Sequence, residues 1–180
     1  MLSEGVRAPS FALPAALGDT LARFDSAEVV GRTVTLLAFY PGDFNEPCTE
    51  ELRALSDLAR SDLGRSVATV GVSTDTAYSH RAFAREHDIA FPLCSDNDGS
   101  VAERYGVLHD EFDGHRRLAM RATFLLNAEG IVRHRWVPED PDDLPAVEEL
   151  RERADDLVRE ESTEEEEGST EGRYARVQDL

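Results

Sequence analysis

Short apolar runs alternate with amphipathic segments along the first half of the chain. Residues 33–40 (TVTLLAFY) are continuously apolar and residues 66–74 (SVATVGVST) nearly so, which is typical of strands covered on both faces. Between these runs, residues 47–60 place their apolar positions, Cys48 among them, on one side at helical spacing. This order predicts a β-α-β unit.

The remaining pattern predicts a mixed sheet around this unit. Segments 11–14 and 20–24 flank a Leu-Gly-Asp turn and predict an N-terminal hairpin, while 123–136 predict an antiparallel hairpin around a second turn. The fold class is therefore α/β, a thioredoxin-like mixed sheet with helices on both faces and an N-terminal β-hairpin. The other expected elements are helices over 77–87, 99–105 and 143–159, and a strand over 91–95 at the sheet edge.

The chain length and its acidic end define the domain organisation. A length of 180 residues, 41% of them hydrophobic, fits one ordinary domain plus a tail. Residues 160–180 contain eight acids and two arginines, too little apolar surface to offset the entropy of ordering. We therefore expect a folded domain over 1–159 and an acidic disordered tail over 160–180.

The net charge of −18 excludes two classes of partner. Such a surface repels nucleic acid and anionic membranes. No apolar run is long enough to span a bilayer and no leader is evident, so a cytoplasmic protein is expected. All 19 basic residues are arginine, which favours a halophilic, high-salt cell over an arginine-rich genome with an acidic proteome.

The two cysteines are the first candidates for chemistry. Cys48 and Cys94 form no C-x-x-C motif, so each thiol is weighed separately. Cys48 lies in the first turn of the expected helix, where free amides and the helix dipole stabilise a thiolate. Carboxylates at Glu46, Glu50 and Glu51 oppose this, so a reactive Cys48 needs an arginine from elsewhere in the fold. The alternative is an inert core cysteine.

The segment around Cys48 changes the balance between these alternatives. Residues 39–52 (FYPGDFNEPCTEEL) closely resemble the active-site segment of peroxiredoxins, which carry Pro-x-x-x-Thr/Ser-x-x-Cys. Residues 91–107 resemble the third strand and following helix of that family, and residues 121–130 resemble the segment that supplies its active-site arginine. The resemblance covers about residues 3–159. It is greatest to the alkyl hydroperoxide reductase C/thiol-specific antioxidant group, especially its bacterioferritin-comigratory (PrxQ-like) members.

This resemblance implies a thiol peroxidase that needs neither metal nor organic cofactor. Cys48 is then the peroxidatic nucleophile, oxidised by hydrogen peroxide or a small organic hydroperoxide to a sulfenic acid. Arg121 supplies the missing positive charge and holds the peroxide oxygens. Pro41 shapes the loop and shields the thiolate. The implied reductant is a thioredoxin-like protein or a small thiol, and a homodimer is left open.

Two positions depart from the family pattern. Asn45 stands where the family has a threonine or serine, and its amide can bond the peroxide or cap the helix instead. Arg53 stands where many PrxQ-like relatives have a resolving cysteine, so Cys94 is the candidate resolving thiol within the chain. A one-cysteine enzyme reduced by an external thiol, an intermolecular bridge and a structural Cys94 are the alternatives.

A non-enzymatic function is the rival hypothesis. Asn45 and the missing cysteine at position 53 would fit a degenerate redoxin-fold module that binds a partner or senses oxidants slowly. The His and acidic residues within 109–115 match no metal-binding spacing and are expected in a solvated loop. His80, His87 and His134 are expected on the surface.

Overall fold

Strands and helices alternate through most of the chain in this computed structural model, which describes residues 1–174, with side chains through Thr163. The α-helices are α1 (Glu46–Arg60), α2 (Ala77–His87), α3 (Ser100–Tyr105) and α4 (Val147–Tyr174), with short 3-10 helices η1 (Ser26–Glu28) and η2 (Leu63–Arg65). The strands are β1 (Ala12–Leu17), β2 (Thr20–Asp25), β3 (Val34–Phe39), β4 (Val67–Ser73), β5 (Leu93–Ser95), β6 (Leu108–Phe112), β7 (His115–Ala119), β8 (Ala122–Leu126) and β9 (Val132–Trp136).

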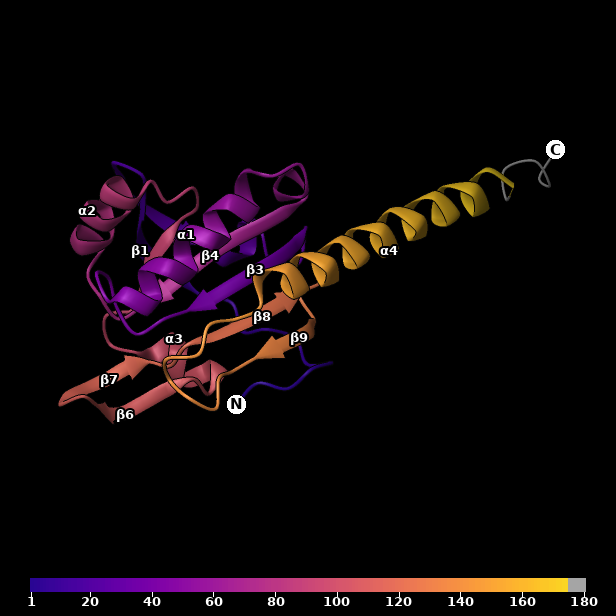
Figure 1. Cartoon of the computed structure of the whole chain (residues 1–180). Helices are drawn as coiled ribbons and strands as arrows, with labels where there is room; N and C mark the ends of the chain where they lie inside the picture. Colours follow the sequence, from indigo (N-terminus) through magenta and orange to yellow (C-terminus); the bar gives the residue numbers. More distant parts are fainter. Residues whose placement is uncertain (175–180) are drawn as a thin grey trace.

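One mixed sheet of seven strands organises the fold, in the order β2-β1-β5-β4-β3-β8-β9 (Figure 1). The strand β3 pairs in parallel with β4 and antiparallel with β8, which confirms the β-α-β unit and the second hairpin. The predicted edge position of β5 is wrong. It pairs with β4 on one side and with β1 on the other, because the N-terminal hairpin adds to the sheet beyond it.

The period of two along β3 divides its side chains between two hydrophobic cores. Leu36 and Ala38 pack in one core, and Leu37 and Phe39 pack in the other. Apolar residues of α1, α2 and α4 complete the first core, whereas α3 contributes to the second. Helices therefore cover both faces, as the sequence predicts.

Two regions differ from the sequence-based expectations. The expected solvated loop around 109–115 instead forms a two-stranded hairpin, β6 and β7. The last helix continues beyond the predicted end at Arg159 to Tyr174 and extends away from the sheet (Figure 1). The backbone amide of Ala128 donates to the Glu161 carboxylate at 2.7 Å, which ties the helix to the body. The division into a domain and a disordered tail stays a prediction, and residues 175–180 lie outside the described residues.

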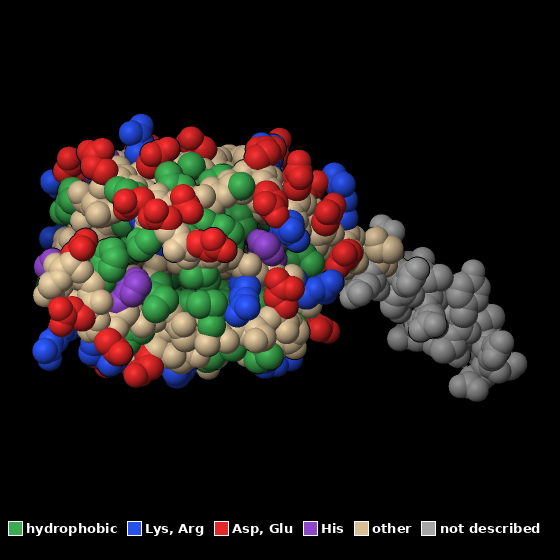
Figure 2. All heavy atoms as spheres, turned by 60° about the horizontal axis from the view of Figure 1, so that its bottom comes forward, with side chains coloured by type: hydrophobic (Ala, Val, Ile, Leu, Met, Phe, Trp, Pro, Cys, Tyr) green, Lys and Arg blue, Asp and Glu red, His purple; other side chains and the backbone are tan. Residues whose placement is uncertain are grey.

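Acidic side chains are spread over the visible face of the body rather than gathered in one patch (Figure 2). The charge is thus a general property of this face. Within residues 1–174, no helix has the length and apolarity needed to cross a bilayer.

Candidate active site

The loop between β3 and α1 brings Cys48 into the first turn of the helix. Pro47 stands in this turn, where its missing amide costs nothing and its fixed φ suits the helix. Asn45 is the N-cap, and its side-chain oxygen accepts from the Cys48 backbone amide at 3.3 Å. The Cys48 side chain is buried against the same core as Leu52 and Leu55. The sequence-predicted helix start is therefore confirmed.

Arg121 reaches the Cys48 thiol from the neighbouring strand. It immediately precedes β8, and the pairing of Phe39 with Ala122 brings it beside the loop that leaves β3. Its Nη2 donates to Cys48 Sγ at 3.5 Å, and its Nε donates to the Pro141 carbonyl at 3.4 Å. Arg121 is only 3% exposed, so its charge acts on the thiol with little screening by water.

Glu51 is the partner of Arg121 that sequence reasoning missed. The two side chains form a buried ion pair, with Arg121 Nη1 donating to Glu51 Oε2. The other carboxylate oxygen, Oε1, is buried without a hydrogen-bond partner among the described residues. The spacing of three residues puts Glu51 on the same helical face as Cys48, and this was the signal in the sequence. Glu51 was weighed only as an opposing charge.

The electrostatics of the site balance burial against Arg121. Burial raises the pKa of Cys48, and the Glu51 charge adds to this, whereas Arg121 and a backbone hydrogen bond from Gly42 lower it. The net pKa of the thiol lies above its ordinary value. Burial also raises the pKa of Glu51 to about 7 against the opposing charge of Arg121. Burial would lower the pKa of Arg121, but Glu51 and Cys48 raise it above its ordinary value.

Pro41 and Asn45 lie at the two ends of this loop. Pro41 is half-buried two residues after the end of β3, and Asn45 is exposed at the start of α1. Of the two sequence-based interpretations of Asn45, the helix cap is the one its side-chain oxygen adopts. The hydroxyl of Thr49 donates back to the Asn45 carbonyl at 2.9 Å, so it is engaged within the helix.

Cys94 lies on the other side of the sheet from Cys48. It is fully buried in β5, between β1 and β4, and packs in the second core together with Val72 and Ala15. Burial raises the pKa of its thiol far above the ordinary value. The structure therefore separates the two thiols by the sheet itself.

His80 corrects another sequence-based expectation. It was expected on the surface of α2, but its side chain is completely buried and pairs with Asp43 of the loop before Cys48. In the described part of the chain, no group of three or more His, Cys, Asp or Glu side chains is arranged to hold a metal ion.

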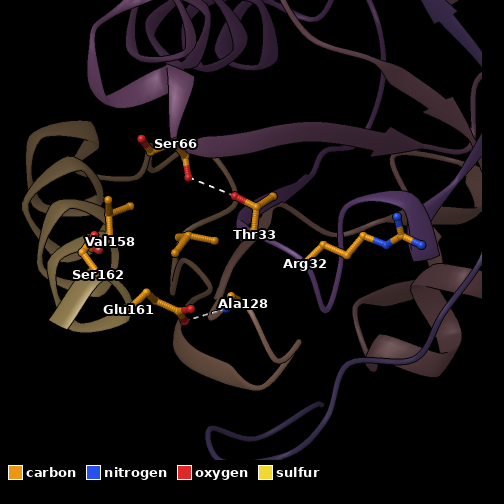
Figure 3. A pocket seen from close by; sticks show the side chains of 8 residues that line it. Arg32, Thr33, Ser66, Ala128, Val158, Glu161 and Ser162 are labelled. Carbon is orange, nitrogen blue, oxygen red and sulfur yellow. Dashed lines mark hydrogen bonds between the residues drawn. The ribbon is translucent and has the colours of Figure 1, made fainter. Parts of the chain in front are cut away.

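A pocket of about 290 Å³ lies at the far end of β3, beneath α4 (Figure 3). Its lining includes Thr33 and Ser66, whose hydroxyl and carbonyl already bond each other, and Glu161, which already accepts from Ala128. Since Cys48 follows the opposite end of β3, this pocket is separate from the thiol.

Comparisons with known proteins point to one family. The family model described as AhpC/TSA family matches residues 5–135. The chain is 34% identical over 137 residues to a peroxiredoxin bcp of Coxiella burnetii, covering 75% of this chain and 88% of that protein. It is 33% identical over 158 residues to a thioredoxin peroxidase of Fasciola hepatica, covering 84% and 79%.

Solved structures agree with this finding. The reduced 2-Cys peroxiredoxin of Plasmodium vivax matches with a TM-score of 0.75 at 29% identity, covering 88% of this chain and 83% of that one. The peroxidoxin BcpB of Mycobacterium tuberculosis matches with a TM-score of 0.73 at 26% identity, covering 88% and 97%.

Proposed function

This chain belongs to the AhpC/TSA family, and we propose that it is a thiol-dependent peroxidase that reduces hydrogen peroxide or small organic hydroperoxides. The observation that carries the proposal is the contact between the Arg121 guanidinium and the Cys48 sulfur at 3.5 Å, in the first turn of a helix. A thiol held between a cation and helix amides is suited to nucleophilic attack.

The reaction starts from the Cys48 thiolate. The sulfur attacks one peroxide oxygen, a sulfur–oxygen bond forms and the oxygen–oxygen bond breaks. The leaving oxygen takes up a proton and departs as water or an alcohol, while the sulfur, oxidised by two electrons, becomes a sulfenic acid. Arg121 stabilises the negative charge that develops on the peroxide oxygens. Since burial raises the pKa of Cys48, the rate is expected to rise with pH until the thiol is ionised.

Pro41 and Asn45 have supporting roles in this proposal. The half-buried ring of Pro41 limits the access of water to the thiolate. The Asn45 oxygen is engaged with the Cys48 amide, so only its amide group is left to donate to a bound peroxide.

We propose that an external thiol, not Cys94, reduces the sulfenic acid. A disulfide requires Cα atoms within about 7 Å, whereas the two thiols pack in cores on opposite faces of the sheet. The external thiol displaces water from the sulfenic acid to form a mixed disulfide, which a second thiol then reduces. The name of the Fasciola hepatica relative, thioredoxin peroxidase, supports a thioredoxin-like reductant.

The setting of the reaction is also proposed from composition. A net charge of −18 without a single lysine supports a cytoplasmic enzyme adapted to high salt, with neither nucleic acid nor membrane as partner. The free energy of unfolding should then rise between about 0.1 M and about 2 M KCl, as screening weakens self-repulsion. An unchanged value would contradict salt adaptation. Sedimentation in the same buffers would distinguish a homodimer from a monomer.

The peroxidase is tested by a stoichiometric pulse of hydrogen peroxide on the reduced protein in high salt. Intact mass and peptide mapping would follow the products in the wild type, Cys48→Ser and Cys94→Ala. We expect fast oxidation that disappears only in Cys48→Ser, and a sulfenic or sulfinic acid instead of an internal disulfide. Oxidation of Cys48 no faster than that of a free thiol would reject the peroxidase and favour a binding or sensing module.

A further inference from the structure

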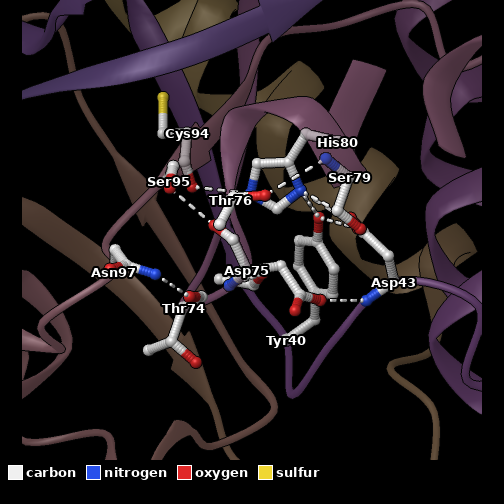
Figure 4. Close-up of polar contacts among 11 residues, drawn as sticks. Tyr40, Asp43, Thr74, Asp75, Thr76, Ser79, His80, Cys94, Ser95 and Asn97 are labelled. Carbon is white, nitrogen blue, oxygen red and sulfur yellow. Dashed lines mark hydrogen bonds and ion pairs between the residues drawn. The ribbon is translucent and has the colours of Figure 1, made fainter. Parts of the chain in front are cut away.

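A buried network of polar side chains holds the loop that precedes Cys48 (Figure 4). At its centre is the carboxylate of Asp43, which is 1% exposed. It accepts from the Tyr40 hydroxyl at 2.9 Å and from the Ser79 hydroxyl at 2.6 Å. The Nδ1 atom of the His80 ring lies 2.9 Å from Asp43 Oδ2. The loop is thereby fastened to the first turn of α2.

His80 connects the same carboxylate to a third element. Its Nε2 lies 3.2 Å from the backbone carbonyl of Cys94 in β5. A carbonyl can only accept, so Nε2 carries a proton. Nδ1 then faces the Asp43 carboxylate, and this contact is favourable only if a second proton lies between the two groups. The geometry thus indicates a buried, hydrogen-bonded pair of His80 and Asp43.

The loop contains a strained backbone conformation, which needs contacts with the surrounding residues to persist. Phe44 has a φ of 60°, a left-handed conformation that is rare for an aromatic residue. Its ring packs at right angles against Phe83 of α2, with centroids 5.3 Å apart. The backbone amide of Asp43 donates to Asp75 Oδ2 at 2.7 Å. The residues on either side of Asp43 are Phe44 and Gly42, and the backbone of Gly42 is one of the groups that lower the pKa of Cys48.

We propose that Asp43 and His80 are positioning residues of the peroxidase, and that their buried pair holds the strained loop whose last residue, Asn45, accepts from the Cys48 amide. The inference rests on the proposed function of Cys48. Neither residue touches the thiol. Both act by fixing the backbone that does, because a strained conformation persists only where its surroundings over-determine it.

The experiment compares two substitutions of His80. In His80→Asn the side-chain amide can replace Nδ1 as a donor to Asp43, whereas in His80→Gln it replaces Nε2 and leaves Asp43 without this donor. We expect His80→Gln and Asp43→Asn to slow the oxidation of Cys48 by peroxide by about tenfold or more, since small displacements at a reacting centre are costly. His80→Asn should retain most of the wild-type rate constant.

A second measurement separates positioning from general stability. The apparent pKa of Cys48, followed by thiolate absorbance, should rise in His80→Gln because a released loop moves away the Gly42 backbone, which lowers this pKa. The matched control is Ser56→Ala, which removes a buried hydrogen bond to the Ala90 amide, 3.0 Å long, away from the loop. It should lower stability but change neither the rate constant nor the thiol pKa.

Two results would overturn the positioning role. One is an unchanged rate constant and thiol pKa in both Asp43→Asn and His80→Gln. The other is a loss of rate in Ser56→Ala that matches theirs at equal loss of stability. The wild type in the same assay distinguishes the two hypotheses: slow wild-type oxidation rejects the peroxidase, and the thiol pKa of the variants then still tests the positioning.

Discussion

The two thiols of this chain are equally buried but have different surroundings. Cys48 lies at a helix start with the Arg121 guanidinium 3.5 Å from its sulfur. Cys94 lies in the middle of the sheet, and burial is the one cause that raises the pKa of its thiol. Burial raises the pKa of both thiols, and only at Cys48 do a cation and a backbone group act to lower it. The reactivity proposed for Cys48 therefore rests on the polar groups around the thiol rather than on its burial.

The largest expected effect is the contrast between the two thiols themselves. Under a limiting dose of hydrogen peroxide, Cys48 should be oxidised at least about 1000-fold faster than Cys94, because Cys94 reacts only after the sheet opens. Peptide mapping after timed quenching measures both rates in one sample. Equal oxidation rates of both cysteines in the folded protein would contradict the predicted difference between the two thiols.

The next effect is the loss of the cation. Arg121→Gln should slow the oxidation of Cys48 by about 100-fold to 1000-fold, because the developing charge on the peroxide loses its stabilising donor. The pKa of Cys48 should rise, since Arg121 lowers it. Stopped-flow kinetics at several pH values measure both quantities.

The control for Arg121→Gln addresses the carboxylate that is left behind. A buried Glu51 without its partner destabilises the protein, so the double variant Glu51→Gln/Arg121→Gln should recover stability but not rate. Recovery of the wild-type rate constant in the double variant would show that Arg121 acts only through the fold.

A smaller effect is expected when only the carboxylate is neutralised. Glu51→Gln removes a charge that raises the pKa of Cys48, so the thiol pKa should fall. Oxidation should nevertheless slow by about tenfold, because Arg121 loses the group that orients its guanidinium. A thiol pKa that rises in this variant would contradict the arrangement.

Glu51→Gln also tests the pH dependence of stability. The folded-state pKa of about 7 lies above the ordinary 4.5, so Glu51 contributes stability that is present below about pH 4.5 and lost as pH rises through about 7. Urea unfolding across this range should show a decline in the wild type that is weaker in Glu51→Gln. Parallel curves would mean that Glu51 does not titrate there.

The smallest effect concerns the helix cap. Asn45→Ala should lower the free energy of unfolding by about 1 kcal/mol, because the Cys48 amide loses its acceptor. Asn45→Ser, which can cap equally well, should restore this stability. Chemical unfolding of the three proteins measures the difference, and an Asn45→Ala variant as stable as the wild type would argue against the cap.

The sequence predicted the two segments that form the candidate site, one around Cys48 and the other around Arg121. A continuous apolar run predicted the strand β3. The residues Asn-Glu-Pro at 45–47 mark the start of the helix that carries Cys48. Residues 121–130 were expected to supply the arginine, and the pairing of β3 with β8 brings Arg121, just before β8, to Cys48. Such features depend on local periodicity and capping, which neighbouring residues determine.

The contacts between distant segments were not predictable in this way. Glu51 pairs with a residue 70 positions away, and His80 meets Asp43 across 37 positions. His80 was expected on the surface because α2 is polar at most positions, and nothing in its own helix indicates the carboxylate that it meets. The same limit explains why the edge position predicted for β5 is wrong. The N-terminal hairpin pairs with β5 and takes the edge of the sheet instead.

Local sequence thus specified the elements, including the helix whose first turn carries Cys48, because hydrogen bonding and side-chain periodicity act over a few residues. Only the packing of those elements decided which distant side chains meet. It put Cys94 behind the sheet from Cys48, paired Arg121 with Glu51, and buried His80 against Asp43. These contacts depend on burial. Burial removes water and strengthens the interactions between charged groups, but only after distant segments have packed together.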